Sequence, residues 1–508
     1  MKIFWALAVF AFAVLGVAAV WLGGLNQDEG WYLYAANMVA EGKTLYKDFF
    51  FTQGPVMPTI YDGFTWVWQK WGLLGARIFT LTLGFAGICF ATGLARSLAP
   101  EGRKGEASLI AFMLLGCNLY HLYYVAIPKT YALASVFVLM GFIILMLLGN
   151  RHVAIRYFGA ALSGHIFAVA AGTRISLAAL LVVVGLWLLI GFRRYRFAFL
   201  WFGLGGLIGL CLVYGVYLIH PSTRAGLIAA QQYHAARGGF DMVWAVGSVS
   251  RLVRWYLPVF VVLGLGVAHA LEARAVRTEN QTIRQSNNQT ILLWGFLAVF
   301  VVQMLAPFPY EDYQVPIMGL LAVYASVAFV RNDGFLTSGK DSAFPLTVLL
   351  VLGLCFANSF GSPLLEKWMT NGQDRFWSLK KEKCELSQLR DVAKRIERID
   401  PDGKTIFTQD LYLAIETNRK VPKGLEMGPF AMLTDEEWKT LLSETAPREC
   451  AVAALSGYSF AILPPKCDER PVAQQLDFWT CLKRSFELVG REEAFGQNAT
   501  PLLILKRK

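Results

Sequence analysis

Two adjacent carboxylates, Asp28 and Glu29, directly follow an apolar run that is long enough to cross a membrane. A charged side chain is costly to keep beside the hydrocarbon region, so its presence there suggests a function. At this depth a carboxylate could act as general base on the hydroxyl of an acceptor, while its neighbour orients it or holds a divalent cation. The alternative interpretation is that the acids mark the membrane edge and cap a helix, because negative charge stabilises a helix N-terminus.

Membrane-spanning helices are the elements that would position these acids. Of the 508 residues, 56% are hydrophobic and 16% are charged, against about 25% charged in ordinary soluble proteins. A span needs about 20 apolar residues, which predicts a polytopic α-helical membrane protein with about eleven spans. They cover approximately residues 3–25, 73–98, 107–127, 131–148, 157–171, 175–192, 197–219, 256–271, 291–305, 315–330 and 344–360.

The charged residues divide the chain into two parts. The first 363 residues carry 38 of the charged side chains and the last 145 carry 45. We therefore expect a transmembrane module over residues 1–363 and a soluble domain over residues 373–508.

Basic residues in the short loops predict the orientation in the membrane. They gather in alternate loops, at residues 103–104, 151–156, 193–196, 274–284 and 331–340. If these loops are cytoplasmic, the N-terminus is cytoplasmic and the C-terminal domain is periplasmic or extracellular, as in a multi-pass protein of the bacterial inner membrane. Segments 26–72 and 220–255 then form long outer loops. The net charge of +11 is thus a topology signal, and we expect no nucleic-acid partner.

The residues after the two acids predict a helix that lies flat on the membrane. Trp31, Tyr34 and Met38 recur at helical spacing, and Gly42 is suited to end the helix. Further along, Gln53-Gly54-Pro55 is typical of a turn that leads the chain back.

The stretch from Asp28 to Tyr61 resembles the first extracytoplasmic loop of the GT-C glycosyltransferases, in particular bacterial relatives of protein O-mannosyltransferases and of the transferases that add aminoarabinose to lipid A. The resemblance rests on Asp28-Glu29 after the first span, Tyr46-Lys47-Asp48-Phe49, Gln53-Gly54-Pro55 and Arg77 in the second span. It implies a GT-C fold and transfer of a sugar from a polyprenyl-phosphate donor to a lipid, glycan or protein acceptor outside the membrane. It also implies inversion at the anomeric carbon, with Asp28 as general base, Glu29 beside it, and cations near the leaving phosphate.

Two departures from the family pattern bear on the phosphate ligand. Gln53 stands where relatives often have a lysine, and the loop over residues 127–130 has Lys129 where relatives often have an acid. Arg174 is isolated between two apolar runs, where an unpaired charge is costly, although it could also be a residue that snorkels to the membrane edge. The candidate ligands for the donor phosphate are Gln53, Arg77, Arg174, Arg237, Arg251 and Arg254.

A segment over residues 307–313 pairs two acids with two tyrosines, a composition suited to sugar hydroxyls. It could supply the acid that the loop at 127–130 lacks, or it could be an interface belt with solvated charges. The candidate residues of a sugar or acceptor cavity are Tyr34, Tyr124, Tyr310, Glu311, Asp312 and Tyr313. The cofactor is unknown from the sequence. Asp28 is a candidate ligand for a divalent cation such as Mg²⁺ or Mn²⁺, and no His/Cys spacing suggests zinc.

The polar tail predicts a small α/β domain. We expect helices over residues 379–398 and from residue 410, and strands over residues 405–408, 459–463 and 502–505. Four cysteines predict two disulfides in an oxidising compartment, or four reduced thiols if the tail lies in the cytoplasm. They are Cys384, Cys450, Cys467 and Cys481.

A transporter or flippase of lipid-linked sugars is the competing function. It predicts inverted repeats and charged or broken helices at the middle of the membrane. The chain shows no clear internal repeat, and its candidate charges gather at the predicted outer edge. These features favour the transferase.

Overall fold

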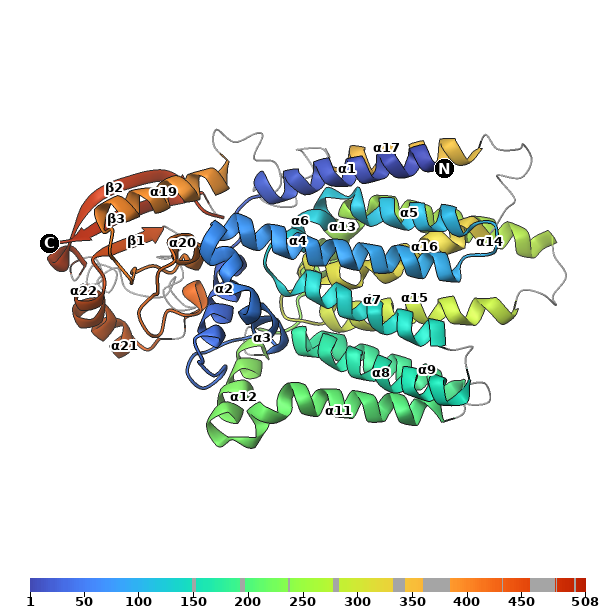
Figure 1. Cartoon of the computed structure of the whole chain (residues 1–508), viewed down its shortest axis with the longest axis horizontal. Helices are drawn as coiled ribbons and strands as arrows, with labels where there is room; N and C mark the ends of the chain where they lie inside the picture. Colours follow the sequence, from blue (N-terminus) through green and yellow to red (C-terminus); the bar gives the residue numbers. More distant parts are fainter. Residues whose placement is uncertain are drawn as a thin grey trace.

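Long helices lie side by side in one bundle, and the elements after residue 384 gather at one end of it (Figure 1). The computed structural model describes residues 1–148, 152–191, 197–235, 238–276, 283–331, 343–359, 384–431, 433–456, 480, 482–497 and 499–508. The bundle contains α1 (Lys2–Trp21), α4 (Thr65–Leu98), α5 (Lys104–Gly116), α6 (Leu119–Ala126), α7 (Thr130–Leu148), α8 (Val153–Thr173), α9 (Ala179–Ile190), α11 (Ala198–Ile219), α14 (Leu257–Val276), α15 (Ile283–Met304), α16 (Val315–Arg331) and α17 (Ala343–Ser359).

Each predicted apolar run coincides with helix. Within the described ranges, five helices are long and apolar enough to cross a membrane, or up to seven if each of two bent pairs forms one span. Four shorter apolar helices accompany them, over Thr130–Met146, Ile175–Ile190, Gln289–Met304 and Pro345–Ser359. The count of eleven spans stays a prediction.

The third predicted run is two helices rather than one. Helices α5 and α6 meet at 67°, because Asn118 starts a new helix there: its side-chain oxygen accepts a hydrogen bond from the backbone N–H of His121. Such a side-chain cap satisfies a donor that a continuous helix would have bonded to its own backbone.

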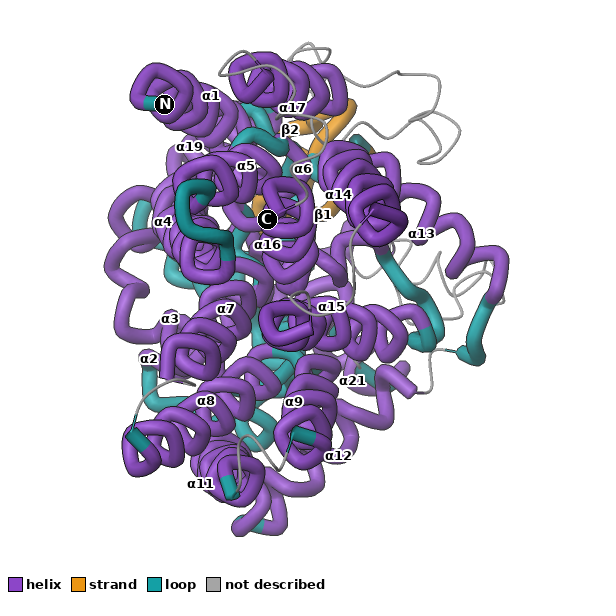
Figure 2. Tube along the Cα trace, turned by 90° about the vertical axis from the view of Figure 1, so that its right-hand side faces the viewer, coloured by secondary structure: helices purple, strands orange, loops and turns teal. Residues whose placement is uncertain are grey.

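The position of each helix in the bundle matches its apolar surface. Seen along the helices, α1 and α11 lie near opposite edges while α16 lies among the others (Figure 2). Most of α16 is buried, whereas α1 and α11 leave large apolar side chains exposed, such as Val17 and Leu212. Exposed apolar faces of this extent would be costly in water, so they fit a lipid environment.

Helix α2 (Gln27–Ala40) lies between the bundle and the tail, and α3 (Val56–Tyr61) and α12 (Pro221–Ala235) lie at the same end (Figure 1). The predicted helix therefore exists and ends at the predicted place, where Gly42 has φ 81°. Its residues 29–36 are buried by the bundle and the tail, and α2 runs across the direction of the long helices (Figure 1). Its position flat on the membrane stays a prediction. Gly30 is needed there, since a Cβ would come within 2.2 Å of the backbone nitrogen of Tyr412 in the tail.

The tail is a small α/β domain whose apolar core continues into α2 and α3. Its helices are α19 (Glu385–Ile399), α20 (Leu411–Glu416), α21 (Asp435–Thr440) and α22 (Ala446–Glu449). The strands β1 (Val452–Ser456), β2 (Phe486–Phe495) and β3 (Thr500–Arg507) form an antiparallel sheet in the order β1-β3-β2.

The predicted elements of the tail agree with this sheet in part. The strand predicted over residues 502–505 lies within β3. The one predicted over residues 405–408 makes only isolated bridges, such as Phe407 with Ala453, and the one over residues 459–463 lies outside the described residues.

The two disulfides predicted for the tail cannot both be present, because two of the four cysteines are free in the structure. Cys384 and Cys450 are free thiols. Cys384 donates to the carbonyl of Trp21, at the end of α1, and Cys450 is buried in the domain core. The other two cysteines of the tail, Cys467 and Cys481, lie outside the described residues.

Candidate active site

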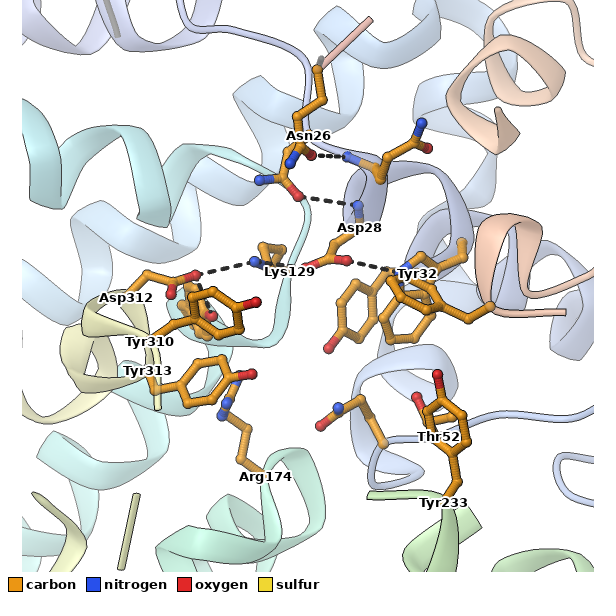
Figure 3. A pocket seen from close by; sticks show the side chains of 16 residues that line it. Asn26, Asp28, Tyr32, Thr52, Lys129, Arg174, Tyr233, Tyr310, Asp312 and Tyr313 are labelled. Atoms are coloured by element: carbon orange, nitrogen blue, oxygen red, sulfur yellow. Dashed lines mark hydrogen bonds and ion pairs between the residues drawn. The ribbon is translucent and has the colours of Figure 1, made fainter. Parts of the chain in front are cut away.

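A cavity of about 210 Å³ lies where the bundle, α2 and the tail meet (Figure 3). Every segment predicted to lie on the outer side contributes to its wall, and the tail adds two residues. The lining residues are Asn26, Gln27, Asp28, Trp31, Tyr32, Thr52, Gln53, Lys129, Tyr131, Arg174, Tyr233, Tyr310, Asp312, Tyr313, Phe430 and Gln497. Segments that are far apart in the sequence thus converge on one polar site.

Asp28 is held in the first turn of α2 by a capping box. The side chain of Asn26 accepts a hydrogen bond from the backbone N–H of Asp28 at 3.0 Å, and the Glu29 carboxylate accepts one from the backbone N–H of Asn26 at 2.9 Å. The Asp28 carboxylate accepts a hydrogen bond from the Trp31 indole at 3.0 Å and remains partly accessible. The sequence therefore positions this carboxylate locally, through caps that favour negative charge at the helix N-terminus.

Lys129 joins Asp28 to a second acid. Its ammonium lies 2.7 Å from a carboxylate oxygen of Asp28 and 3.3 Å from one of Asp312 (Figure 3). Tyr131 donates a hydrogen bond to the same oxygen of Asp312 at 2.8 Å. Burial by itself lowers the pKa of Lys129, but the attraction of Asp28, Tyr131 and Asp312 outweighs it and raises that pKa, so the side chain stays protonated.

Arg174 lies in the cavity with its guanidinium between two aromatic rings. The guanidinium carbon is 4.9 Å from the ring centre of Tyr131 and 4.6 Å from that of Tyr313. A 3.4 Å hydrogen bond joins it to the hydroxyl of Thr130, and its buried Nε has no partner among the described residues. A buried donor without a partner is costly, which suits a site that receives an anionic ligand.

The turn at Gln53-Gly54-Pro55 packs against the end of α8, just before Arg174. A Cβ on Gly54 would come within 2.1 Å of the carbonyl oxygen of Gly172, so only glycine fits this contact. The close approach brings Gln53 into the same cavity wall as Arg174.

The tail closes one side of the cavity. Gln497 accepts a hydrogen bond from the backbone N–H of Gln27 at 2.9 Å, and the side chain of Gln27 donates to Asp410 at 2.6 Å. Phe430 packs edge to face with Trp31 at 6.3 Å between ring centres. The polar tail is thus part of the site and not only a neighbouring domain.

Glu29 and Arg77 do not lie in the cavity, contrary to the roles expected for them. Both are fully buried, and Arg77 forms a bidentate ion pair with Glu29 at 2.6 and 2.7 Å. The guanidinium also donates to the carbonyl groups of Val20, Gly23 and Gly24. With its donors used in this way, Arg77 ties α1, α2 and α4 together and cannot serve a phosphate.

Other predicted site residues are also placed elsewhere. The hydroxyl of Tyr34 accepts a hydrogen bond from the backbone N–H of Val421 in the tail at 3.0 Å, so this ring belongs to the interface between α2 and the tail. Tyr124 packs within the bundle against Tyr131 at 5.9 Å between ring centres.

The acid and arginines around helix α13 (Met242–Trp255) do not line the cavity either. Glu311 pairs with Arg251 at 2.9 Å, and Arg254 lies over the ring of Trp255 at 4.2 Å. Arg237 lies outside the described residues. Of the predicted set, the structure brings together Asp28, Gln53, Arg174, Tyr310, Asp312 and Tyr313.

The arrangement does not fit a divalent cation between the acids. Asp28 and Asp312 are the carboxylates of the cavity wall, and the Lys129 ammonium contacts both. Among the described residues, no group of three or more His, Cys, Asp or Glu side chains could hold a metal ion. The fit is poor because the lysine already neutralises the oxygens that would bind the metal.

Comparison with solved structures identifies the fold. The chain is similar to ArnT from Cupriavidus metallidurans bound to undecaprenyl phosphate, with a TM-score of 0.60 and 14% sequence identity over 99% of this chain and 97% of that chain. The apo state of the same protein gives a TM-score of 0.58, with 16% identity over 98% and 97% of the chains. An oligosaccharyltransferase from Archaeoglobus fulgidus, tethered to an acceptor peptide, gives 0.52 and 10% identity over 97% and 74% of the chains.

These solved proteins are members of the GT-C superfamily, so the resemblance indicated by the first outer loop is confirmed. The chain shares the fold of these proteins, and its longest apolar helices have the length and composition of membrane spans. No protein-family model matches its sequence, and no curated protein matches it either. At these identities the similarity to the solved structures shows the fold, and the activity has to be argued from the cavity.

Proposed function

We propose that the chain is a glycosyltransferase that moves a sugar from a polyprenyl-phosphate donor to a lipid, glycan or protein acceptor at the extracytoplasmic surface. The observation that carries the proposal is the cavity, whose wall contains the Asp28 carboxylate together with the cations Lys129 and Arg174. The presence of undecaprenyl phosphate in a solved structure with the same fold supports a donor of this class.

In the proposed reaction, Asp28 is the general base. An acceptor hydroxyl donates its proton to the Asp28 carboxylate while its oxygen attacks the anomeric carbon of the sugar. The bond from that carbon to the phosphate oxygen breaks, and its electron pair leaves on the lipid phosphate. Attack opposite the leaving group inverts the configuration. The acceptor must therefore enter from the side of α2.

Lys129 and Arg174 are suited to the leaving phosphate. Preorganised cations in a site with little water stabilise charge that develops in a transition state. Arg174 offers its unpartnered Nε. Asp28 and Asp312 are the hydrogen-bonding partners of the Lys129 ammonium in the described part of the chain, so a third N–H of that group can turn to a ligand. The rings of Tyr310 and Tyr313 can pack against the sugar.

Transfer of sugar from a panel of polyprenyl-phosphate sugars to membrane lipids, glycans and proteins tests the proposal. Purified full-length protein in lipid vesicles should release the free polyprenyl phosphate and form a glycosylated product. The proposal fails if intact, correctly folded protein transfers no sugar from any donor of the panel but moves such lipids between leaflets, since that result would favour the flippase.

Replacing Arg174 with glutamine should raise the KM for the lipid donor by about 10- to 100-fold, because hydrogen bonds to charged groups contribute about 1.5–3 kcal/mol. Steady-state kinetics at varied donor concentration measures this change. The matched control is Arg224→Gln, on the exposed surface of α12. An unchanged KM in Arg174→Gln would exclude Arg174 as a phosphate ligand.

The proposed orientation predicts opposite labelling of two exposed acids. Glu493 lies on β2 in the tail, and Glu101 lies in the loop between α4 and α5 that we expect in the cytoplasm. In a background without other reactive cysteines, Glu493→Cys should react with a membrane-impermeant maleimide in cells with a permeable outer membrane. Glu101→Cys should react only after the inner membrane is opened. The reverse pattern would overturn the orientation.

A further inference from the structure

We infer that the ammonium of Lys129 takes the place of a divalent metal between Asp28 and Asp312, so that the site binds and turns over its donor without a metal ion. The inference rests on the proposed function and concerns the chemistry of the same cavity. It replaces the sequence-based expectation of a Mg²⁺ or Mn²⁺ ion at Asp28.

The geometry leaves the metal no room. One oxygen of Asp28 and one of Asp312 lie 2.7 and 3.3 Å from the ammonium. These are hydrogen-bond distances, and they place the nitrogen between the two acids (Figure 3). Mg²⁺ would need oxygen ligands at about 2.0–2.1 Å in an octahedral shell. It could use the same oxygens only if the ammonium moved away.

Lys129 is poorly placed to move. Its side chain is 6% exposed, and its ammonium also lies 4.9 Å from the ring centre of Tyr131. The backbone N–H of Lys129 is bonded to the carbonyl of Ile127 at 2.7 Å, in the short turn between α6 and α7. Removing the ammonium from both carboxylates would leave a buried charge without its partners, which is strongly unfavourable.

The charges of the cavity balance without a metal. Two carboxylates, Asp28 and Asp312, face two permanent cations, Lys129 and Arg174. A phosphate that enters this site meets cations that are already present. An added divalent ion would have to compete with Lys129 for the carboxylates. The lysine can thus serve the leaving phosphate in the way that a metal serves it in other transferases.

Binding of Mn²⁺ to the full-length protein, followed by electron paramagnetic resonance, tests the inference without reference to activity. The wild type should show no saturable Mn²⁺ site that depends on Asp28, whereas Lys129→Ala should gain one, because the two carboxylates are then free for the metal. The matched control is the double variant Lys129→Ala/Asp312→Asn, which should lose the gained site.

Chelation supplies the second measurement, in case Lys129→Ala does not fold. Transfer by the wild type should be the same in EDTA and in added Mn²⁺. The inference is overturned if EDTA abolishes transfer and Mn²⁺ restores it, if the wild type binds Mn²⁺ at a site that Asp28→Asn removes, or if folded Lys129→Ala gains no site. If no donor supports transfer, the proposed function fails, and the Mn²⁺ measurements still decide whether Lys129 excludes the metal.

Discussion

Replacing Asp28 with asparagine should lower the turnover of sugar transfer by about 10²- to 10⁴-fold, the usual contribution of a general base. Asparagine has nearly the same shape and can still accept the hydrogen bond from the Trp31 indole, but it cannot take the proton of the acceptor. The KM for the donor should change much less than kcat, because Asp28 is assigned to the acceptor. Single-turnover kinetics with purified protein would separate the two effects.

A neighbouring acid provides the control for this variant. Asp48 lies in the same outer segment and is exposed, and its carboxylate accepts a hydrogen bond from the backbone N–H of Thr44. Asp48→Asn should keep wild-type kinetics. If folded Asp28→Asn also keeps them, Asp28 is not the base, and Asp312 becomes the acid to test next.

Replacing Arg77 with methionine should destabilise the protein by about 3–5 kcal/mol, as expected when one partner of a buried ion pair is removed. The loss would leave Glu29 buried without its counter-charge and would remove a donor from three carbonyl groups, one in the last turn of α1 and two just after it. Thermal unfolding in detergent should show a clear fall in Tm. The donor KM of the fraction that remains folded should be unchanged, since Arg77 does not touch the cavity.

Two further variants make this prediction specific. Arg96→Met removes an exposed arginine from the same helix, α4, and should leave the Tm almost unchanged. Glu29→Gln combined with Arg77→Met removes both charges and should be more stable than Arg77→Met alone. Equal Tm values for Arg77→Met and Arg96→Met would contradict the structural role of the pair.

The pair Asp28-Glu29 shows that the sequence could locate a candidate site but could not assign a role to each of its residues. Their position after an apolar run predicted a site at the membrane edge, and in the structure Asp28 lines the cavity. That position could not show which of the two acids lines the site, because two adjacent residues of a helix point in different directions. One faces the cavity and the other faces Arg77, and that difference depends on packing against α4 and the tail. The direction in which each side chain points depends on how its helix packs in the whole fold, and spacing along the chain does not reveal it.

Lys129 is the site residue that sequence reasoning passed over. The sequence showed Lys129 as a departure from a family pattern in which an acid is expected. Its role could not be inferred without knowing which residue it contacts. Asp312 lies 183 positions further along the chain, and only the folded bundle brings the two together. Arg174, by contrast, could be predicted from its isolation between apolar runs, since such a charge needs a ligand or a partner. The helices themselves were predictable because apolar length is a strong local signal.

The contribution of Gln497 and Phe430 to the cavity has a consequence for biosynthesis. Asp28, the proposed base, precedes most of the bundle in the chain, but one wall of its cavity comes from Phe430 and Gln497 in the tail. We therefore expect the bundle to have no complete site until the tail has been made and has folded against α2. A variant that lacks the tail should then form the helical bundle and yet have no complete site. In the proposed reaction, this order of synthesis would keep a half-built bundle from reacting with the lipid donor.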